Sequence, residues 1–206
     1  MAEIRDAEIH KLIGGALCLD FANTLHGHGR VPLHEYLINY RDLVLWSRHA
    51  GILTVRETRS LIQKAIQRPY KSLLTFRKVL TLREAIYRIF SAVAQGTFPK
   101  KADLHTLTEA YLEALTHSCF VRVENGFAWG WTNERTLDRM LWPIVLSAAN
   151  LLTSENLRWV RECAGDGCDW LFVDTSRNRM RRWCTMNECG NRAKMRRRYV
   201  RQRKRG

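Results

Sequence analysis

The sequence predicts a mainly α-helical fold that ends in a small, distinct C-terminal module, and three observations carry this prediction. Apolar residues recur at helical spacing through most of the first 152 residues. A single pair, Asn125-Gly126, lies between two short alternating runs and predicts one β-hairpin. Beyond residue 157 the composition changes abruptly, because four of the six cysteines are concentrated there among arginines. We therefore expect a helical domain over 1–152 and a second domain over 158–206, joined by a short linker.

The helices of the first domain are expected from apolar periodicity and from end signals. An apolar, helix-like segment over 12–25 opens with a pair of glycines. Thr54 and Glu57 form a capping box that starts the third helix, and Pro69 lies just past its end. Asp103 and Thr106 mark the start of the fifth helix in the same way. The helices predicted after the first segment span residues 35–50, 55–67, 72–95 and 103–117.

The hairpin and one more helix complete the first domain. The hairpin strands are expected over 120–124 and 127–131. Thr132 or Asn133 then caps a helix that runs to about Leu152, with a kink or a fresh start at Pro143.

Polar side chains near the N-terminus are the first candidate functional residues. Asp20 and Asn23 lie in a segment that should be mostly buried. A buried carboxylate needs partners, so Asp20 should meet an arginine or backbone amides. We favour a polar staple between helices, and a ligand contact is the alternative. Residues 26–34 contain two glycines, one proline and three histidines, which favours a surface loop over a second metal site.

Charge is distributed unevenly along the chain. The net charge is +14 with a pI near 10. Residues 158–206 hold 15 Lys and Arg against 5 Asp and Glu, a net of +10. A basic end on a nearly neutral body indicates a polyanionic partner, and a solubilising tail is the alternative.

No segment of the sequence predicts a membrane or an export route. No run approaches the roughly 20 apolar residues of a membrane span. The N-terminus carries Glu3, Asp6 and Glu8 where a signal peptide would be basic. We therefore expect a cytoplasmic protein without a membrane partner, in which reducing conditions disfavour disulfides. Cys18 and Cys119 lie among apolar residues and are expected to be buried thiols.

The other four cysteines form two pairs of equal spacing, Cys163-x4-Cys168 and Cys184-x4-Cys189, separated by fifteen residues. Four thiolates at about 2.3 Å are typical of a structural zinc ion. We therefore predict one Zn²⁺ per chain, and a pair of redox disulfides is the alternative. Four cysteines would close the coordination shell, so we expect no catalytic residues and no enzymatic activity.

The second domain is predicted to be a knuckle, a β-hairpin and a helix around this ion, a treble-clef-like arrangement. Strands are expected over 158–162 and 170–174, with a returning strand over 181–184. A helix should run from about Asn191 to Arg203. The hairpin and this helix carry the candidate nucleic-acid-binding residues, which are Arg177, Arg179, Arg181, Arg182, Arg192, Lys194, Arg196, Arg197, Arg198, Arg201 and Arg203.

Duplex DNA is the favoured partner, because arginine forks fit phosphates and the guanine edge. For Arg177, Arg179 and Arg182, pairing within the module with Asp169 or Asp174 is the alternative. Two other functions remain open, a structured-RNA-binding protein and a zinc-dependent protein-interaction module.

The last part of the chain resembles a known family. WLFVDTSRNRMRRWCTMNECGNRAKMRRRYVR resembles the CGNR zinc finger, which is named for the run Cys189-Gly190-Asn191-Arg192. LCLDFANTL, YRDLVLWSRHAGIL and LREAIYRIFSAV resemble the helical ABATE domain that precedes this finger in bacterial proteins. The family is regarded as stress-induced transcription regulators.

The resemblance implies roles for both parts of the chain. It implies the four cysteines as zinc ligands and a C-terminal helix that contacts DNA. It also implies that the helical domain acts as a sensor or partner-binding module, for a small-molecule effector or a protein. One finger reads few bases, so a homodimer is also open.

Overall fold

The computed structural model describes residues 11–28, 34–132 and 136–203. Helices dominate the described residues, and the strands form two-stranded antiparallel ribbons, β1-β2, β3-β4 and β5-β6. The mainly helical class predicted from the sequence is confirmed. The elements are α1 (Leu17–Ala22), β1 (Leu25–His26), β2 (His34–Glu35), α2 (Tyr40–His49), α3 (Val55–Gln67), α4 (Pro69–Ala94), α5 (Lys101–Thr116), β3 (Ser118–Val123), β4 (Gly126–Trp131), α6 (Leu141–Leu152), η1 (Glu155–Trp159), β5 (Val160–Glu162), β6 (Leu171–Val173), η2 (Met186–Gly190) and α7 (Asn191–Arg203).

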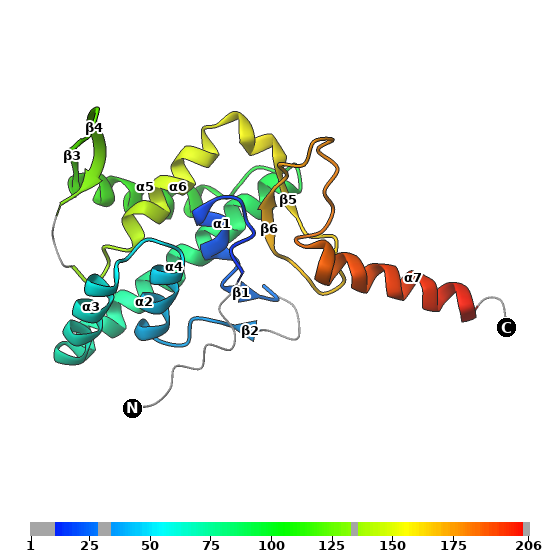
Figure 1. The fold of residues 1–206 in the computed structure, drawn as a ribbon, viewed down its shortest axis with the longest axis horizontal. Helices are drawn as coiled ribbons and strands as arrows, with labels where there is room; N and C mark the ends of the chain where they lie inside the picture. Colours follow the sequence, from blue (N-terminus) through cyan, green and yellow to red (C-terminus); the bar gives the residue numbers. More distant parts are fainter. Residues whose placement is uncertain (1–10, 29–33, 133–135, 204–206) are drawn as a thin grey trace.

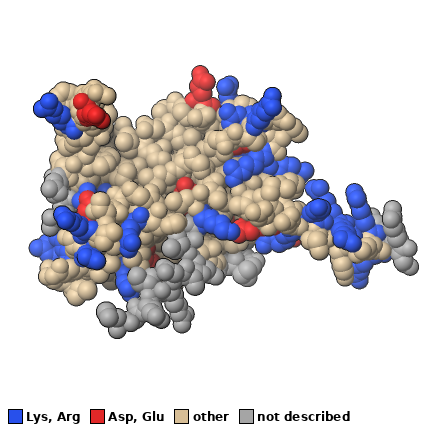
Figure 2. Space-filling view, viewed as in Figure 1, with Lys and Arg blue, Asp and Glu red and all other residues tan. Residues whose placement is uncertain are grey.

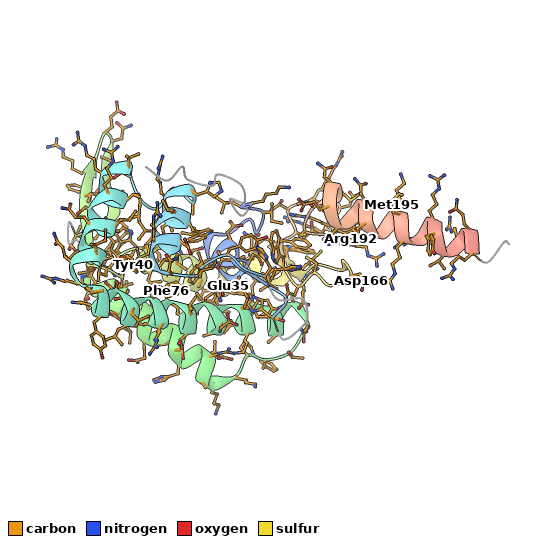
Figure 3. All side chains as sticks on the ribbon, turned by 90° about the horizontal axis from the view of Figure 1, so that it is seen from below. Glu35, Tyr40, Phe76, Asp166, Arg192 and Met195 are labelled. Carbon is orange, nitrogen blue, oxygen red and sulfur yellow. The ribbon has the colours of Figure 1, made fainter. Side chains whose placement is uncertain are left out.

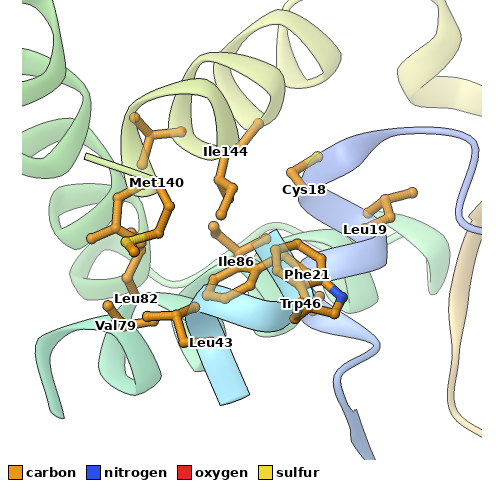
Figure 4. Packing of buried hydrophobic residues seen from close by; sticks show 14 of the residues in the cluster. Cys18, Leu19, Phe21, Leu43, Trp46, Val79, Leu82, Ile86, Met140 and Ile144 are labelled. Carbon is orange, nitrogen blue, oxygen red and sulfur yellow. The ribbon is translucent and has the colours of Figure 1, made fainter. Parts of the chain in front are cut away.

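The short helix α1 lies at the centre of the hydrophobic core. Cys18, Leu19 and Phe21 have no exposed surface, and α1 packs against both α4 and α6. The ring of Phe21 meets that of Trp46 of α2 at a centroid distance of 5.5 Å (Figure 4). Six residues are too few for a helix to be stable alone, so α1 is held by this burial. Burial also raises the pKa of the Cys18 thiol to about 12, as expected for an inert buried cysteine.

Helix starts follow the capping signals where these exist. Thr54 and Glu57 cap α3 reciprocally, and its bounds agree with the prediction. The helix α2 begins later than predicted, at Tyr40, because Asn39 forms a capping box with Asp42.

Two starts were predicted too late. The helix α4 begins at Pro69, because proline suits the first position of a helix. The same residue that lies just past the end of α3 therefore starts α4. The helix α5 begins at Lys101 without a side-chain cap. Asp103 is buried and accepts from Nε of Arg88 at 3.0 Å instead of capping the helix.

The predicted hairpin is confirmed as β3-β4, with Phe120 opposite Trp129. It projects from the helical body (Figure 1). Thr132 continues the hairpin by donating its N–H to the carbonyl of His117 at 2.8 Å, so it does not cap a helix. Asn133 lies outside the described residues. The helix α6 starts afresh at Leu141 and carries Pro143 in its first turn. Cys119 lies in β3 and is only partly buried.

The predicted loop over 26–34 is structured at both described ends. His26 pairs with His34 in the β1-β2 ribbon. His28 has a side chain only 5% exposed; it stacks on Tyr87 at 3.4 Å and contacts Glu84. Packing therefore explains His28, whereas His34 is exposed, and residues 29–33 lie outside the described part.

The C-terminal part is a short ribbon, β5-β6, followed by an irregular turn and α7. Residues 181–184 do not form the predicted returning strand. The N–H of Arg181 donates to the carboxylate of Asp174 at 2.9 Å, and the carbonyl of Arg182 accepts from Ala164 at 2.8 Å. A buried carboxylate thus replaces the neighbouring strand that the alternation in the sequence had suggested.

The β5-β6 ribbon shares the core of the helical part. Val160, Leu171 and Val173 belong to the same hydrophobic cluster as α1, α4 and α6. Trp170 and Phe172 pack instead in a second cluster with the four cysteines. In contrast, α7 has no buried residue and extends away from the body (Figure 1). None of the helices in the described ranges has the length and hydropathy of a membrane span.

Candidate metal centre and basic surface

The first cysteine pair is held by the ends of the β5-β6 ribbon. Cys163 directly follows β5, and its N–H donates to the carbonyl of Trp170 at 2.9 Å, which extends the ladder by one bond. Between the cysteines the chain turns tightly, with Cys168 N–H donating to the carbonyl of Gly165 at 3.0 Å. A Cβ at Gly165 would lie 2.9 Å from the sulfur of Cys189. Glycine is therefore needed for this turn to pack on the sulfurs.

The second pair is placed by the single-turn helix η2. Thr185 caps it by accepting from the N–H of Glu188 at 3.3 Å. This turn brings Cys189 back over Cys184, and their sulfurs lie 3.5 Å apart. Because α7 follows η2 without a break, the position of Cys189 also fixes where α7 begins.

The geometry of the four sulfurs fits a tetrahedral metal. Their Sγ atoms lie within 4.8 Å of one another and all four residues are buried. The Sγ atoms of Cys168 and Cys184 are 3.8 Å apart. A tetrahedron with bonds of about 2.3 Å has edges of about 3.8 Å, so a zinc ion fits at the centre. No other potential metal-binding group of this kind occurs among residues 11–28, 34–132 and 136–203.

The electrostatics of the quartet also favour a cation. Hydrogen bonds from the thiols of Cys168 and Cys184, helped by backbone N–H groups, lower the pKa of Cys163 far below the usual thiol range. The same contacts with Cys163, together with burial, raise the pKa of Cys168 and Cys184. The protein alone thus stabilises the thiolate of Cys163 and disfavours deprotonation of Cys168 and Cys184. Full deprotonation would require a divalent ion among the sulfurs.

Hydrogen-bond donors surround the sulfurs on two sides. Sγ of Cys163 accepts from the backbone N–H groups of Cys184 at 3.2 Å and Gly165 at 3.4 Å. Sγ of Cys189 accepts from Nη2 of Arg192 at 3.0 Å, a contact that raises the pKa of the guanidinium. Donors of this kind stabilise thiolate ligands and orient them.

Several of the predicted nucleic-acid-binding arginines contact the protein itself. Arg181 lies over the ring of Phe172 at 4.2 Å and donates to the carbonyls of Trp183 at 3.1 Å and Ile13 at 3.4 Å. Arg179 has a left-handed backbone (φ 50°), lies 5.0 Å from the ring centroid of Trp159 and donates to the carbonyl of Asp174. The structure therefore uses the side chains of both arginines to hold the module together.

Other members of the predicted set make looser contacts. Arg182 lies 5.6 Å from the ring of Trp183, and Arg203 lies 5.6 Å from the ring of Tyr199. Arg196 forms an exposed ion pair with Asp166, which lies in the turn between Cys163 and Cys168 and near Arg192 in Figure 3. An exposed pair of this kind contributes little stability and leaves the arginine free to exchange partners.

The remaining members form what we call the free basic set. Each is exposed, and within the described part of the chain none has an ion pair or side-chain hydrogen bond. Lys and Arg gather over the C-terminal module and along α7 on the face in Figure 2. The free basic set is Arg177, Lys194, Arg197, Arg198 and Arg201.

Asp20 and Asn23 lie away from the sulfurs but hold the strand that follows Cys168. The side chain of Asn23 donates to the carbonyl of Leu171 at 2.9 Å and accepts from its N–H at 2.8 Å. Asp20 accepts from the N–H of Gly14 at 2.7 Å, and the carbonyl of Gly14 accepts from Val173 at 2.8 Å. The predicted polar staple is therefore present, although it joins α1 to β6 and not to another helix. Burial raises the pKa of Asp20 to about 6.

From the sequence, Asp169 was considered only as a possible partner of arginines, and its structural role was missed. Asp169 is 1% exposed and accepts from the backbone N–H groups of Gly27, at 3.1 Å, and His28. It therefore ties the residue after Cys168 to the end of β1. Its position, between Cys168 and the aromatic residues that follow, could have marked Asp169 as a structural residue. Nothing in the sequence, however, identifies its partners, which lie 141 and 142 residues away.

Comparison with known families finds two similarities. The ABATE family, described as "Putative stress-induced transcription regulator", matches residues 15–155. The CGNR zinc finger matches residues 159–202, which include all four cysteines. No curated protein matches the chain.

Proposed function

Because the chain belongs to the ABATE family and ends in a CGNR zinc finger, we propose that it is a bacterial, cytoplasmic, stress-responsive transcription regulator that binds duplex DNA. The four cysteines would hold one Zn²⁺, which stabilises the module and closes its own coordination shell. The helical part would carry the regulatory input, from a small molecule or a protein partner. The description of the family as a stress-induced regulator, which matches residues 15–155, supports that assignment.

The shape and charge of α7 carry the proposal. Seven of its thirteen residues are Lys or Arg, none is acidic and none is buried. At about 1.5 Å per residue the helix is about 20 Å long. It leaves the body at the cysteines and projects outward (Figure 1). A helix with this shape can enter a major groove about 12 Å wide without bringing the helical part into contact with the DNA backbone.

The same features favour duplex DNA over the two rival partners. The major groove of A-form RNA is too deep and narrow for a helix to read. An acidic protein could also bind a basic helix, but arginine forks match phosphate and guanine edges best. Met195, Tyr199 and Val200 give α7 only a short apolar surface for a protein groove, because seven of its thirteen residues are Lys or Arg.

Salt dependence gives a quantitative test. If the five residues of the free basic set each displace one counterion, log K should fall against log salt with a slope of about −4.5. Affinity for a duplex should then fall about 500-fold between roughly 50 and 200 mM salt. Fluorescence anisotropy with a labelled genomic duplex and the zinc-loaded full chain measures this slope.

A matched pair of variants locates the contact surface. Arg197, Arg198 and Arg201 changed together to glutamine should reduce the slope by about 3, because three phosphate contacts are lost. The control changes three exposed basic residues at the far end of the molecule, Arg56, Arg59 and Lys71, to glutamine and should leave the slope unchanged. Equal effects of the two triple variants would show that binding follows net charge and not α7.

Competition separates the rivals in the same assay. A stem-loop RNA of equal length that competes better than the duplex would assign the module to RNA. The absence of salt-dependent binding to either nucleic acid would favour a protein partner.

A further inference from the structure

The first basic residue of α7, although exposed, contacts the metal centre. Arg192 lies in the first helical turn, three residues after Cys189, so the two side chains are neighbours on one face. Its Nη2 donates to Sγ of Cys189 at 3.0 Å. Figure 3 places Arg192 at the junction of α7 with the module, whereas Met195 lies further along the helix.

Charge explains why a guanidinium is needed there. Four thiolates and one divalent cation carry a net charge of −2 in a site where all four ligands are buried. Buried charge is costly unless it is paired. In the described part of the chain, Arg192 is the cationic side chain that hydrogen-bonds a sulfur of the quartet. The backbone N–H groups of Gly165 and Cys184 supply dipoles to Cys163 but no charge.

Two other residues of the Cys189-Gly190-Asn191-Arg192 run make contacts at the start of α7. A Cβ on Gly190 would lie 2.9 Å from Sδ of Met186, so a larger residue would have to displace the exposed end of that side chain. The side chain of Asn191 donates to the carbonyl of Asn187 at 3.1 Å and so closes the turn before α7. Asn191 and Arg192 therefore both make contacts at the junction between η2 and α7.

We propose that Arg192 is a positioning residue of the zinc site: its guanidinium neutralises the tetrathiolate and fixes the first turn of α7 on the metal, and it does not contact nucleic acid. The proposal rests on the zinc centre of the proposed function, but it is independent of DNA binding. It removes Arg192 from the predicted nucleic-acid-binding residues and assigns it to the metal.

Zinc affinity tests the proposal without nucleic acid. The full chain is loaded with zinc and titrated with a chromophoric chelator. R192Q should weaken zinc binding by about 10–100-fold, the usual effect of losing a partner of a metal ligand. R192K keeps the charge but loses the fork, so its loss should be smaller. The matched control is R197Q, on the same helix and in the free basic set, which should remain within about twofold of the wild type.

Cobalt substitution adds a readout that a general loss of stability would not produce. The hydrogen bond lowers the energy of the sulfur electrons, so its loss should move the thiolate-to-cobalt charge-transfer band to lower energy in R192Q. The band should not move in R197Q. If R192Q does not fold, the chelator titration and cobalt spectrum of R192K decide the matter.

The outcomes are distinct from those of the proposed function. Wild-type zinc affinity and an unmoved cobalt band in R192Q would overturn the assignment. So would a DNA salt slope that falls by about 0.9 in zinc-saturated R192Q, as expected for R197Q, because Arg192 would then contact phosphate. A protein that binds zinc but no DNA would sink the DNA proposal and leave this one standing. A wild-type protein that binds no metal would refute both the zinc centre and the role of Arg192.

Discussion

Replacing Asn23 by alanine would remove one of the contacts that join α1 to the zinc finger. The side-chain amide of Asn23 pairs with both backbone groups of Leu171, at 2.9 Å and 2.8 Å, and both residues have no exposed surface. Alanine supplies neither partner. The N–H and the carbonyl of Leu171 on that side would then stay buried without their hydrogen bonds.

The cost follows from these two groups. Each buried polar group left unsatisfied costs about 1–3 kcal/mol, so the pair should cost on the order of 4 kcal/mol. This is a large part of the roughly 5–15 kcal/mol by which domains are stable. Asn150→Ala is the control, because Asn150 is exposed on α6 and its side chain has no hydrogen bond to the described residues. It should change the free energy of unfolding by less than about 0.5 kcal/mol.

Two measurements on the zinc-loaded full chain test this expectation. Urea unfolding gives the free-energy difference between the variants and the wild type. Hydrogen exchange at the Leu171 amide should accelerate by roughly a thousandfold if about 4 kcal/mol of protection is lost. An Asn23→Ala protein that unfolds like the control, with the Leu171 amide still protected, would refute the reasoning.

Three further predictions follow from the metal site and the residues that support it. Cys184→Ser should make the C-terminal module sensitive to protease, because structural zinc supplies about 10–16 kcal/mol in small fingers. Cys119→Ser is the control. Equal protease resistance of the two variants would contradict a module held together by a metal. Removal of residues 196–206 should reduce the magnitude of the DNA salt slope by about 2.7, because three of the five residues of the free basic set are lost. The thermal unfolding of the rest should stay unchanged, since α7 has no buried residue. An unchanged salt slope would exclude the basic end as the contact surface. Burial raises the pKa of Asp20 from 3.8 to about 6, so ionisation of Asp20 destabilises the fold increasingly as pH rises from about 4 to 6. The free energy of unfolding of Asp20→Asn minus that of the wild type, measured by urea unfolding, should therefore rise by about 1 kcal/mol between pH 5 and pH 7. If this difference does not change with pH, Asp20 is not the titrating group.

Local signals in the sequence predicted those parts of the fold that depend on neighbours along the chain. The capping box of Thr54 and Glu57 gave the bounds of α3, and the Asn125-Gly126 pair gave the β3-β4 hairpin. The matched spacing of the cysteine pairs gave a quartet that the structure brings together. Each of these features is set within a few residues or by the geometry of a single ion.

Contacts between distant segments were not predictable in the same way. Asn23 and Leu171 are 148 residues apart, and only the packing of α1 on β6 makes them partners. The carboxylate of Asp174 accepts a hydrogen bond from the N–H of Arg181. The sequence pattern had instead predicted that Arg181 lies in a strand.

The arginines show the limit most clearly. Arg181, Arg192 and Arg197 carry the same charge within a span of seventeen residues. Their surroundings, which are an aromatic face, a sulfur and open solvent, differ completely.

The common core of the helices and the β5-β6 ribbon restricts how such chains can be recombined. Val160, Leu171 and Val173 pack in one hydrophobic cluster with side chains of α1, α4 and α6, which precede them in the sequence. A chimaera that joins the finger of one relative to the helices of another would therefore pack poorly in this shared core, even if the junction lies between residues 155 and 159. Exchange should succeed only when the donor also contributes the helices that line this core, α1, α4 and α6, so the two halves are expected to be inherited as a matched set.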